Sequence, residues 1–175
     1  MNETLAIINQ ILEEHKVIIR QALNLEQVAN DAETIVTLNK ASETFMPGRL
    51  EHNQAFQKLQ ELHVKVEEGL KKHFNREENQ LLAAFQNHGD ESLLETMQTL
   101  LLEHKDIKNR LDQEKKYMVE LFSGKLSRHL WEATAYDMRA HIAHTRRLLE
   151  AHAEIEQELL HTLRNELMRA HRGKN

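Results

Sequence analysis

The sequence predicts an all-α protein, an antiparallel up-and-down four-helix bundle with long helices. Only five Gly and one Pro occur among 175 residues, and good helix formers such as Ala, Leu, Glu, Lys, Gln and Arg make up most of the remainder. Apolar residues recur at spacings of three and four through four long segments, which is the helical period. A chain of this length has the size of one ordinary domain. We therefore expect a single domain over residues 1–175.

The first half of the chain is expected to supply two of the four long helices. The first covers about residues 3–30, and a less regular helical stretch follows over 31–45 until Met46-Pro47-Gly48 ends it. The second covers about residues 49–86. Asn87-His88-Gly89 comes next, and a glycine in this position favours a left-handed helix end.

The other two helices follow from similar signals. Asp90 is a candidate N-cap for a third helix over about residues 91–122. Ser123-Gly124 interrupts the pattern, and Ser127 is a candidate N-cap for a fourth helix that ends near residue 169. Short connections of this kind favour antiparallel neighbours.

Composition excludes several classes of function. The absence of Cys rules out disulfides, thiolate zinc sites and iron–sulfur clusters held by this chain. A net charge of −5 gives no broad attraction for nucleic acid or anionic lipid. We find neither a signal-peptide pattern nor an apolar run near the ~20 residues that span a bilayer. A cytoplasmic protein with no nucleic-acid or membrane partner is expected.

An internal repeat links the two halves of the chain. Residues 12–18 (LEEHKVI) match residues 101–107 (LLEHKDI) at five of seven positions. On the helix after each of these segments comes His-x-x-x-Glu, at residues 73–77 and 152–156, and a Leu-Leu pair follows both. Each half therefore carries a lone histidine and then a His-x-x-x-Glu motif. A duplication of this kind places related residues at facing positions around a pseudo-twofold axis.

The polar residues of the repeat fall on apolar helix stripes, so they are expected to face the core. They are His15, His73, Glu77, His104, His152 and Glu156. A bundle core keeps four imidazoles and two carboxylates only if they are paired, protonated or bound to metal. Two divalent cations meet this need, each with two imidazole nitrogens and one oxygen from each glutamate. At least one coordination position per ion stays open for another ligand.

Two other interpretations compete with this one. A single His-x-x-x-Glu pair on a helix is common without metal, so a bundle that binds no metal stays an alternative. A ferritin-like carboxylate site needs Glu-x-x-His on two helices, and of this type we find Glu158 with His161. Two matched motifs and two matched lone histidines favour the histidine-rich dinuclear site. Glu78, beside Glu77, is expected to be an ordinary solvated residue.

With these motifs the sequence resembles the hemerythrin-like, or HHE cation-binding, family. The resemblance covers nearly the whole chain and rests on four motifs in order along it: Glu14-His15, His73-x-x-x-Glu77, Glu103-His104 and His152-x-x-x-Glu156. It implies two non-haem iron ions with an oxo or hydroxo bridge. The six residues named above would be the ligands, with both glutamates bridging. It also implies a small gaseous partner, oxygen or nitric oxide.

The chain departs from the oxygen-carrying members of that family at two points. Those proteins have a second histidine four residues after the one on the third helix, where this chain has Lys108. They also step five residues from the last histidine to an aspartate, whereas His152 and Glu156 are four residues apart. The pattern is closer to the iron-sensing, nitric-oxide-related and iron–sulfur-repair branches. The repair proteins usually carry an amino-terminal cysteine segment that this sequence lacks.

Two classes of function follow from the resemblance. The first is a non-haem di-iron protein that binds or senses oxygen, nitric oxide or iron. The alternative is a di-iron enzyme or iron-delivery protein that acts on nitric oxide or peroxide, or in iron–sulfur cluster repair. We favour the first class, because the sequence offers no dedicated base, nucleophile or substrate pocket. It leaves open the physiological ligand, the protein partner, the oligomeric state, and whether His63 or another histidine completes the site.

The count of matched histidines predicts how the protein responds to oxygen. With Lys108 in place of a fifth histidine, each iron would have two histidines and an open position. We expect reduced, iron-loaded protein to oxidise to the diferric state in air without a reversible oxygenated form. The measurement is optical: admit oxygen to anaerobically reduced protein, then apply argon. Repeated recovery of the reduced spectrum under argon would contradict the assignment of two histidines to each iron.

Overall fold

The described part of the chain is helical almost throughout. The computed structural model describes residues 2–44 and 53–172, and no strand occurs within them, which confirms the all-α class. The elements in chain order are α1 (Asn2–Ala29), α2 (Ala32–Thr44), α3 (Gln54–Arg76), the π-helical turn η2 (Glu77–Leu81), α4 (Leu82–His88), α5 (Glu91–Phe122) and α6 (Arg128–Arg172).

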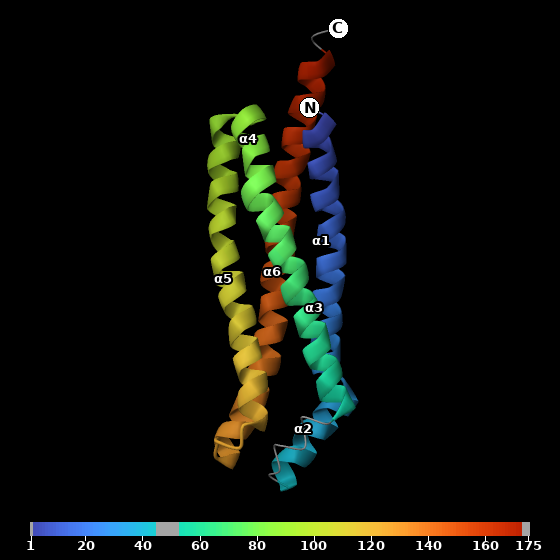
Figure 1. Cartoon of the computed structure of the whole chain (residues 1–175), viewed down its shortest axis with the longest axis vertical. Helices are drawn as coiled ribbons and strands as arrows, with labels where there is room; N and C mark the ends of the chain where they lie inside the picture. Colours follow the sequence, from blue (N-terminus) through green and yellow to red (C-terminus); the bar gives the residue numbers. More distant parts are fainter. Residues whose placement is uncertain (1, 45–52, 173–175) are drawn as a thin grey trace.

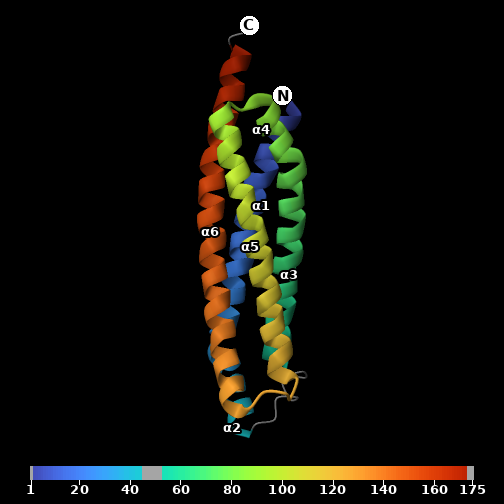
Figure 2. The ribbon, with the colours of Figure 1, turned by 90° about the vertical axis from the view of Figure 1, so that its left-hand side faces the viewer.

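The long helices lie side by side along the long axis of the molecule (Figures 1 and 2). Contacts join α1 to both α3 and α6, and join α5 to both α3 and α6. The short helix α2 packs at the end of the molecule opposite the amino terminus, against α3 and α6 (Figure 1). Helices from both halves of the sequence therefore surround one shared interior.

Several helix ends agree with the sequence-based expectations. The Asp90 carboxylate accepts the amide hydrogen of Leu93 at 2.8 Å, so Asp90 is the N-cap of α5 as expected. Asp31 begins α2 in the same way, with the Thr34 amide 2.7 Å from its carboxylate. Ser127 directly precedes α6, and its backbone carbonyl accepts from the amide of Trp131. The expected helix start at residue 49 and the Met46-Pro47-Gly48 break lie outside the described residues.

Two expectations about the second long helix were wrong. Gly89 is extended, with φ −80° and ψ 157°, so it is not the left-handed helix end that the sequence suggested. A small residue is needed there for another reason, because an added Cβ would lie 2.9 Å from the Phe85 carbonyl oxygen. Among the glycines in the described residues, the left-handed one is Gly124, with φ 71°, two residues after the end of α5. In addition, the π-helical turn η2 interrupts the predicted continuous helix.

The core consists of two hydrophobic clusters. One contains Ile8, Ile11, Leu81 and Leu160, near the end of the molecule where the amino terminus lies. The other is larger and extends from Ile18 to the far end of the helices. The buried histidines and glutamates of the sequence motifs fall between these clusters along the chain. They therefore occupy a polar layer inside an otherwise apolar interior.

No helix in the described ranges combines the length and the apolar composition that a membrane crossing requires.

Candidate metal centre

The structure brings the six predicted ligand residues together as two neighbouring groups. Their ligand atoms lie within 4.8 Å of one another inside each group. The first group contains His15, His73, Glu77 and Glu156, and the second contains Glu77, His104 and His152. All six residues are buried, with exposed fractions of 4% or less. Four long helices and the π-helical turn contribute to these groups, although the residues are up to 141 positions apart.

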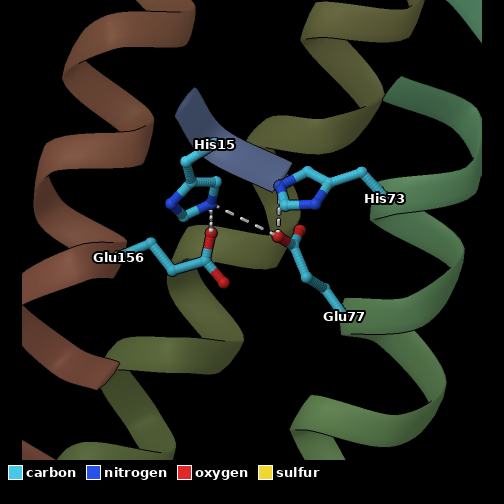
Figure 3. A group of neighbouring side chains, drawn as sticks. All are labelled: His15, His73, Glu77 and Glu156. Atoms are coloured by element: carbon cyan, nitrogen blue, oxygen red, sulfur yellow. Dashed lines mark hydrogen bonds and ion pairs between the residues drawn. The ribbon is translucent and has the colours of Figure 1, made fainter. Parts of the chain in front are cut away.

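The first group is shown in Figure 3. The Nε2 atom of His15 lies 3.0 Å from Oε2 of Glu156 and 3.7 Å from Oε1 of Glu77. On the opposite side, Nε2 of His73 lies 2.6 Å from the same Oε1 of Glu77. Both imidazoles therefore direct Nε2 toward the carboxylates in the space enclosed by the helices.

The second group uses the other oxygen of Glu77. Its Oε2 lies 3.0 Å from Nε2 of His104. The Nε2 atom of His152, on α6, lies 3.9 Å from Oε2 of Glu156. Glu77 thus presents one oxygen to each group, which is the geometry of a carboxylate that bridges two ions.

The atoms that face the centre are suited to a cation. The two carboxylate oxygens of Glu77 and Nε2 of His104 and His152 make no hydrogen bond within the described residues, although each is buried. Buried polar atoms are normally hydrogen-bonded, so nitrogens and oxygens that lie 2.6–3.0 Å apart without hydrogen-bond geometry need an explanation. Imidazole nitrogens and carboxylate oxygens are ligands for iron, zinc and manganese. These residues therefore fit the pair of divalent metal ions that the sequence implies.

The π-helical turn places the shared carboxylate. Glu77 begins η2, and the amide of Leu82 bonds to the Glu77 carbonyl five residues earlier. Such single π turns inside α-helices are frequent at functional sites. Here the turn buries Glu77 completely while the next residue, Glu78, stays at the surface. The helical periodicity of residues 49–86 did not predict this interruption.

Three of the four histidines are oriented by an outer carboxylate. Their Nδ1 atoms pair at 2.9–3.0 Å with Glu14 for His73, Glu78 for His104 and Glu103 for His152. An ionised carboxylate only accepts, so Nδ1 donates its hydrogen, and Nε2 of the neutral ring is then the nitrogen that can bind a cation at the centre. This arrangement is typical of histidines that ligate metal.

Basic side chains hold two of these outer carboxylates. Arg76 pairs with Glu14, and Lys108 lies 3.0 Å from Glu78. Glu78 is exposed, as the sequence suggested, but its carboxylate also contacts a buried histidine, which the sequence analysis did not predict. Its signal in the sequence was its position, five residues after the motif histidine His73.

The duplication explains both the shared features and one difference. Glu14 and Glu103 occupy equivalent repeat positions, and each contacts the motif histidine of its own half. Glu78 corresponds to Gln157, since both follow a motif histidine by five residues. His104 has Glu78 as its partner, whereas Nδ1 of His15 makes no hydrogen bond within the described chain. The two halves of the site are therefore chemically unequal at His15.

The two central glutamates differ in acidity. Burial raises the pKa of Glu77, but its contacts with His104, His15 and His73 outweigh burial and hold that pKa well below its usual range. Burial raises the pKa of Glu156 to about 7, and the charge of Glu77 adds to the rise although the hydrogen bond with His15 opposes it. Glu77 is therefore ionised at neutral pH, while Glu156 binds a proton readily.

His15 holds a proton in the same network. Burial lowers its pKa, but the hydrogen bond to Glu156 and the contact with Glu77 outweigh burial and raise the pKa to about 9. At neutral pH the metal-free site therefore keeps a proton between His15 and Glu156. A metal ion needs a neutral imidazole and an ionised carboxylate, so it must displace that proton.

His63 and Lys108 do not belong to the two groups. His63 contacts Glu114 at 3.1 Å, in a separate layer of the core. Lys108, at the position of the additional histidine in oxygen carriers, is about half exposed and directs its ammonium group to Glu78. His144 and His161 also lie outside the two groups, and both are exposed.

Comparison of the chain with protein-family profiles, with curated proteins and with solved structures gave no match. The functional interpretation therefore depends on the geometry of these residues and on the motif resemblance.

The raised pKa of His15 leads to a prediction about metal binding. At pH 7 the His15 imidazole is protonated in metal-free protein, because its pKa is about 9. We expect zinc binding at pH 7 to release protons, and the affinity to rise as the pH increases toward 9. Calorimetric titration in two buffers of different ionisation enthalpy measures the release. His15→Gln should release fewer protons, while His161→Gln, at an exposed position, should match the wild type. Equal release from all three proteins would contradict the assignment.

Proposed function

We propose that this chain is an antiparallel up-and-down four-helix bundle whose core binds two non-haem iron ions, and that it binds or senses oxygen, nitric oxide or iron. The observation that carries the proposal is the Glu77 carboxylate, which belongs to both groups of ligand atoms. One ion would be held by His15, His73, Glu77 and Glu156. The other would be held by Glu77, His104 and His152, with Glu156 at its edge.

The direction of the helices supports the bundle arrangement. The sequence colours in Figure 1 place the start of α1 and the end of α3 toward one end of the molecule, and the start of α6 at the other end. With α1, α3, α5 and α6 in a ring of contacts, ligand residues from each helix face one interior. This is the arrangement in which bundle proteins build metal sites from facing helices.

The protein residues have identifiable roles around the ions. The apolar clusters on both sides exclude water, and Glu14, Glu78 and Glu103 fix the orientation of three imidazoles. His15 and Glu156 hold a proton next to the site. When bound, two ferrous ions supply electrons and open coordination positions for a small ligand.

A groove between α1 and α3 supports access by a small molecule. It has a volume of about 490 Å³, and Ile18, His73 and Arg76 are among its lining residues. His73 is therefore the point at which the outer surface and the first group of ligands meet. A groove with this lining suits a small diffusible molecule, which is the kind of ligand or substrate that both classes of function require. Turnover assays with nitric oxide and peroxide separate the two.

The shared carboxylate predicts the metal content. We expect two irons per chain in protein produced with iron available. Glu77→Gln should lower both occupancies, because Glu77 contributes to both groups, while Glu156→Gln should retain more metal, because the second group keeps its own residues. Elemental analysis for iron, zinc and manganese together measures this, since zinc binds such ligands tightly. Wild-type protein with one metal or none, after iron loading, would contradict the dinuclear proposal.

Metal removal is expected to lower thermal stability. Without metal, the core holds four imidazoles and two carboxylates that lack a cation, whereas binding to the folded state alone adds about 4 kcal/mol at a thousandfold excess over Kd. The melting temperature of loaded protein should exceed that of metal-free protein, and Glu77→Ala should lose most of this difference. Glu158→Ala, at an exposed position on α6, is the control and should keep it. Identical melting temperatures for loaded and metal-free wild type would contradict the site.

A further inference from the structure

A second buried polar cluster lies in the core, outside the dinuclear groups. His63 on α3, Glu114 on α5 and Thr145 on α6 have exposed fractions of 2%, 0% and 3%. They belong to the half of the molecule that the larger hydrophobic cluster fills. A carboxylate in such surroundings is costly unless a positive group or several hydrogen bonds compensate. The buried Glu114 carboxylate therefore needs groups that compensate its charge.

The contacts of Glu114 supply part of that compensation. Its Oε1 accepts a hydrogen bond from the Thr145 hydroxyl at 2.6 Å, and its Oε2 lies 3.1 Å from Nε2 of His63. Thr145 also bonds to the carbonyl of His141 on its own helix. Within the described residues, no lysine or arginine forms an ion pair with Glu114. A histidine nitrogen and one hydroxyl are thus the polar partners of a fully buried carboxylate.

The atoms of this cluster share the feature that marks the dinuclear site. Three of them are buried and make no hydrogen bond within the described chain: Nε2 of His63, Oε2 of Glu114 and Nε2 of His141. At the dinuclear site the corresponding atoms are those of His104, His152 and Glu77. In both places, imidazole Nε2 atoms lie close to carboxylate oxygens without hydrogen-bond geometry, as Nε2 of His63 does 3.1 Å from Oε2 of Glu114. A cation satisfies such a set at once.

The cluster is separate from the dinuclear site. His63 precedes His73 by ten residues, Glu114 follows His104 by ten, and His141 precedes His152 by eleven. At 1.5 Å per residue, these spacings correspond to about 15 Å along the helices. An ion bound at Glu114 would therefore share no ligand with the first two.

The duplication does not account for the cluster. The repeat relates His63 to Ile142 and Glu114 to Leu25, and both of those residues are buried and apolar. The polar residues therefore occur in one copy, at positions where the other copy shows that an apolar side chain packs well.

We propose that the His63–Glu114 pair binds a third, mononuclear divalent cation, with His141 as a further ligand after rotation of its side chain. Two imidazole nitrogens and one carboxylate suit zinc, ferrous iron or manganese. His141 lies one turn before Thr145 on α6, and its ring centroid is 5.8 Å from that of Tyr117. In the structure His141 does not form a group of ligand atoms with His63 and Glu114, so it becomes a ligand only after its ring rotates. The ion would link α3, α5 and α6 in the half of the molecule away from the dinuclear site.

The test compares zinc stoichiometry between variants. Metal-free full-length protein is saturated with zinc, separated from free zinc by gel filtration and analysed for zinc per chain. Wild type should retain one equivalent more than Glu114→Gln and one more than His63→Gln. Glu114→Gln keeps the volume of the side chain, and circular dichroism verifies that each variant folds; if one does not, the other decides. His161→Gln, at an exposed position, should retain the wild-type amount.

The outcome is independent of the dinuclear proposal, because the quantity measured is the difference between wild type and the two variants. If the dinuclear site were absent, the total would fall but this difference would remain. Equal zinc content in wild type and both folded variants would overturn the third site. Nitrogen-15 spectra of labelled histidine at saturating zinc give a second measurement. A zinc-bound Nε2 is expected for His63, and a His63 ring protonated at both nitrogens would show an ion pair with Glu114 instead.

Discussion

Burial of the Glu77 carboxylate is the constraint on which the rest of the core depends. The side chain is fully buried, so its charge must be compensated inside the protein. His15, His73 and His104 meet it from three different helices at 3.7, 2.6 and 3.0 Å. Because these contacts outweigh the cost of burial, the pKa of Glu77 stays low and its carboxylate remains ionised. A pair of divalent ions at this point would satisfy the carboxylate and the imidazoles together.

The outer carboxylates extend this constraint to the surface. Glu14, Glu78 and Glu103 each fix one imidazole through Nδ1, and Arg76 and Lys108 hold two of these glutamates from outside. Each such series of contacts connects a buried histidine to a partly exposed basic or acidic residue. The geometry of the interior therefore depends on residues that composition alone would assign to a solvated surface.

The approximate symmetry of the duplication is broken where the chemistry differs. His104 has Glu78 as its outer partner. In the other half, the residue equivalent to Glu78 is Gln157, so His15 has no carboxylate at that place. The difference places the unpartnered Nδ1 and the shared proton on the same side, at His15 and Glu156. The His63–Glu114 pair, which has no counterpart in the other half, adds a second asymmetry. An inherited repeat thus supplies the framework, and single substitutions make its two halves unequal.

Sequence periodicity by itself determined the helical class, because the stripe of apolar residues around each helix repeats with the helical period. It also determined the six buried polar residues, because His15, His104 and the two His-x-x-x-Glu motifs fall on those stripes. Their role as ligands stays a prediction.

The tertiary structure decided which atoms meet: that Glu77 contributes to both groups, and that Glu78 contacts His104. It also placed His63 beside Glu114 instead of at the dinuclear site. Glu114 lies on the same buried face of α5 as Leu111 and Met118. Such pairings join residues far apart in the chain, and local spacing contains no information about the rotation and register of one helix against another. The π-helical turn escaped prediction for a related reason, since it depends on what the surrounding helices require of Glu77 and not on the propensity of residues 77–81.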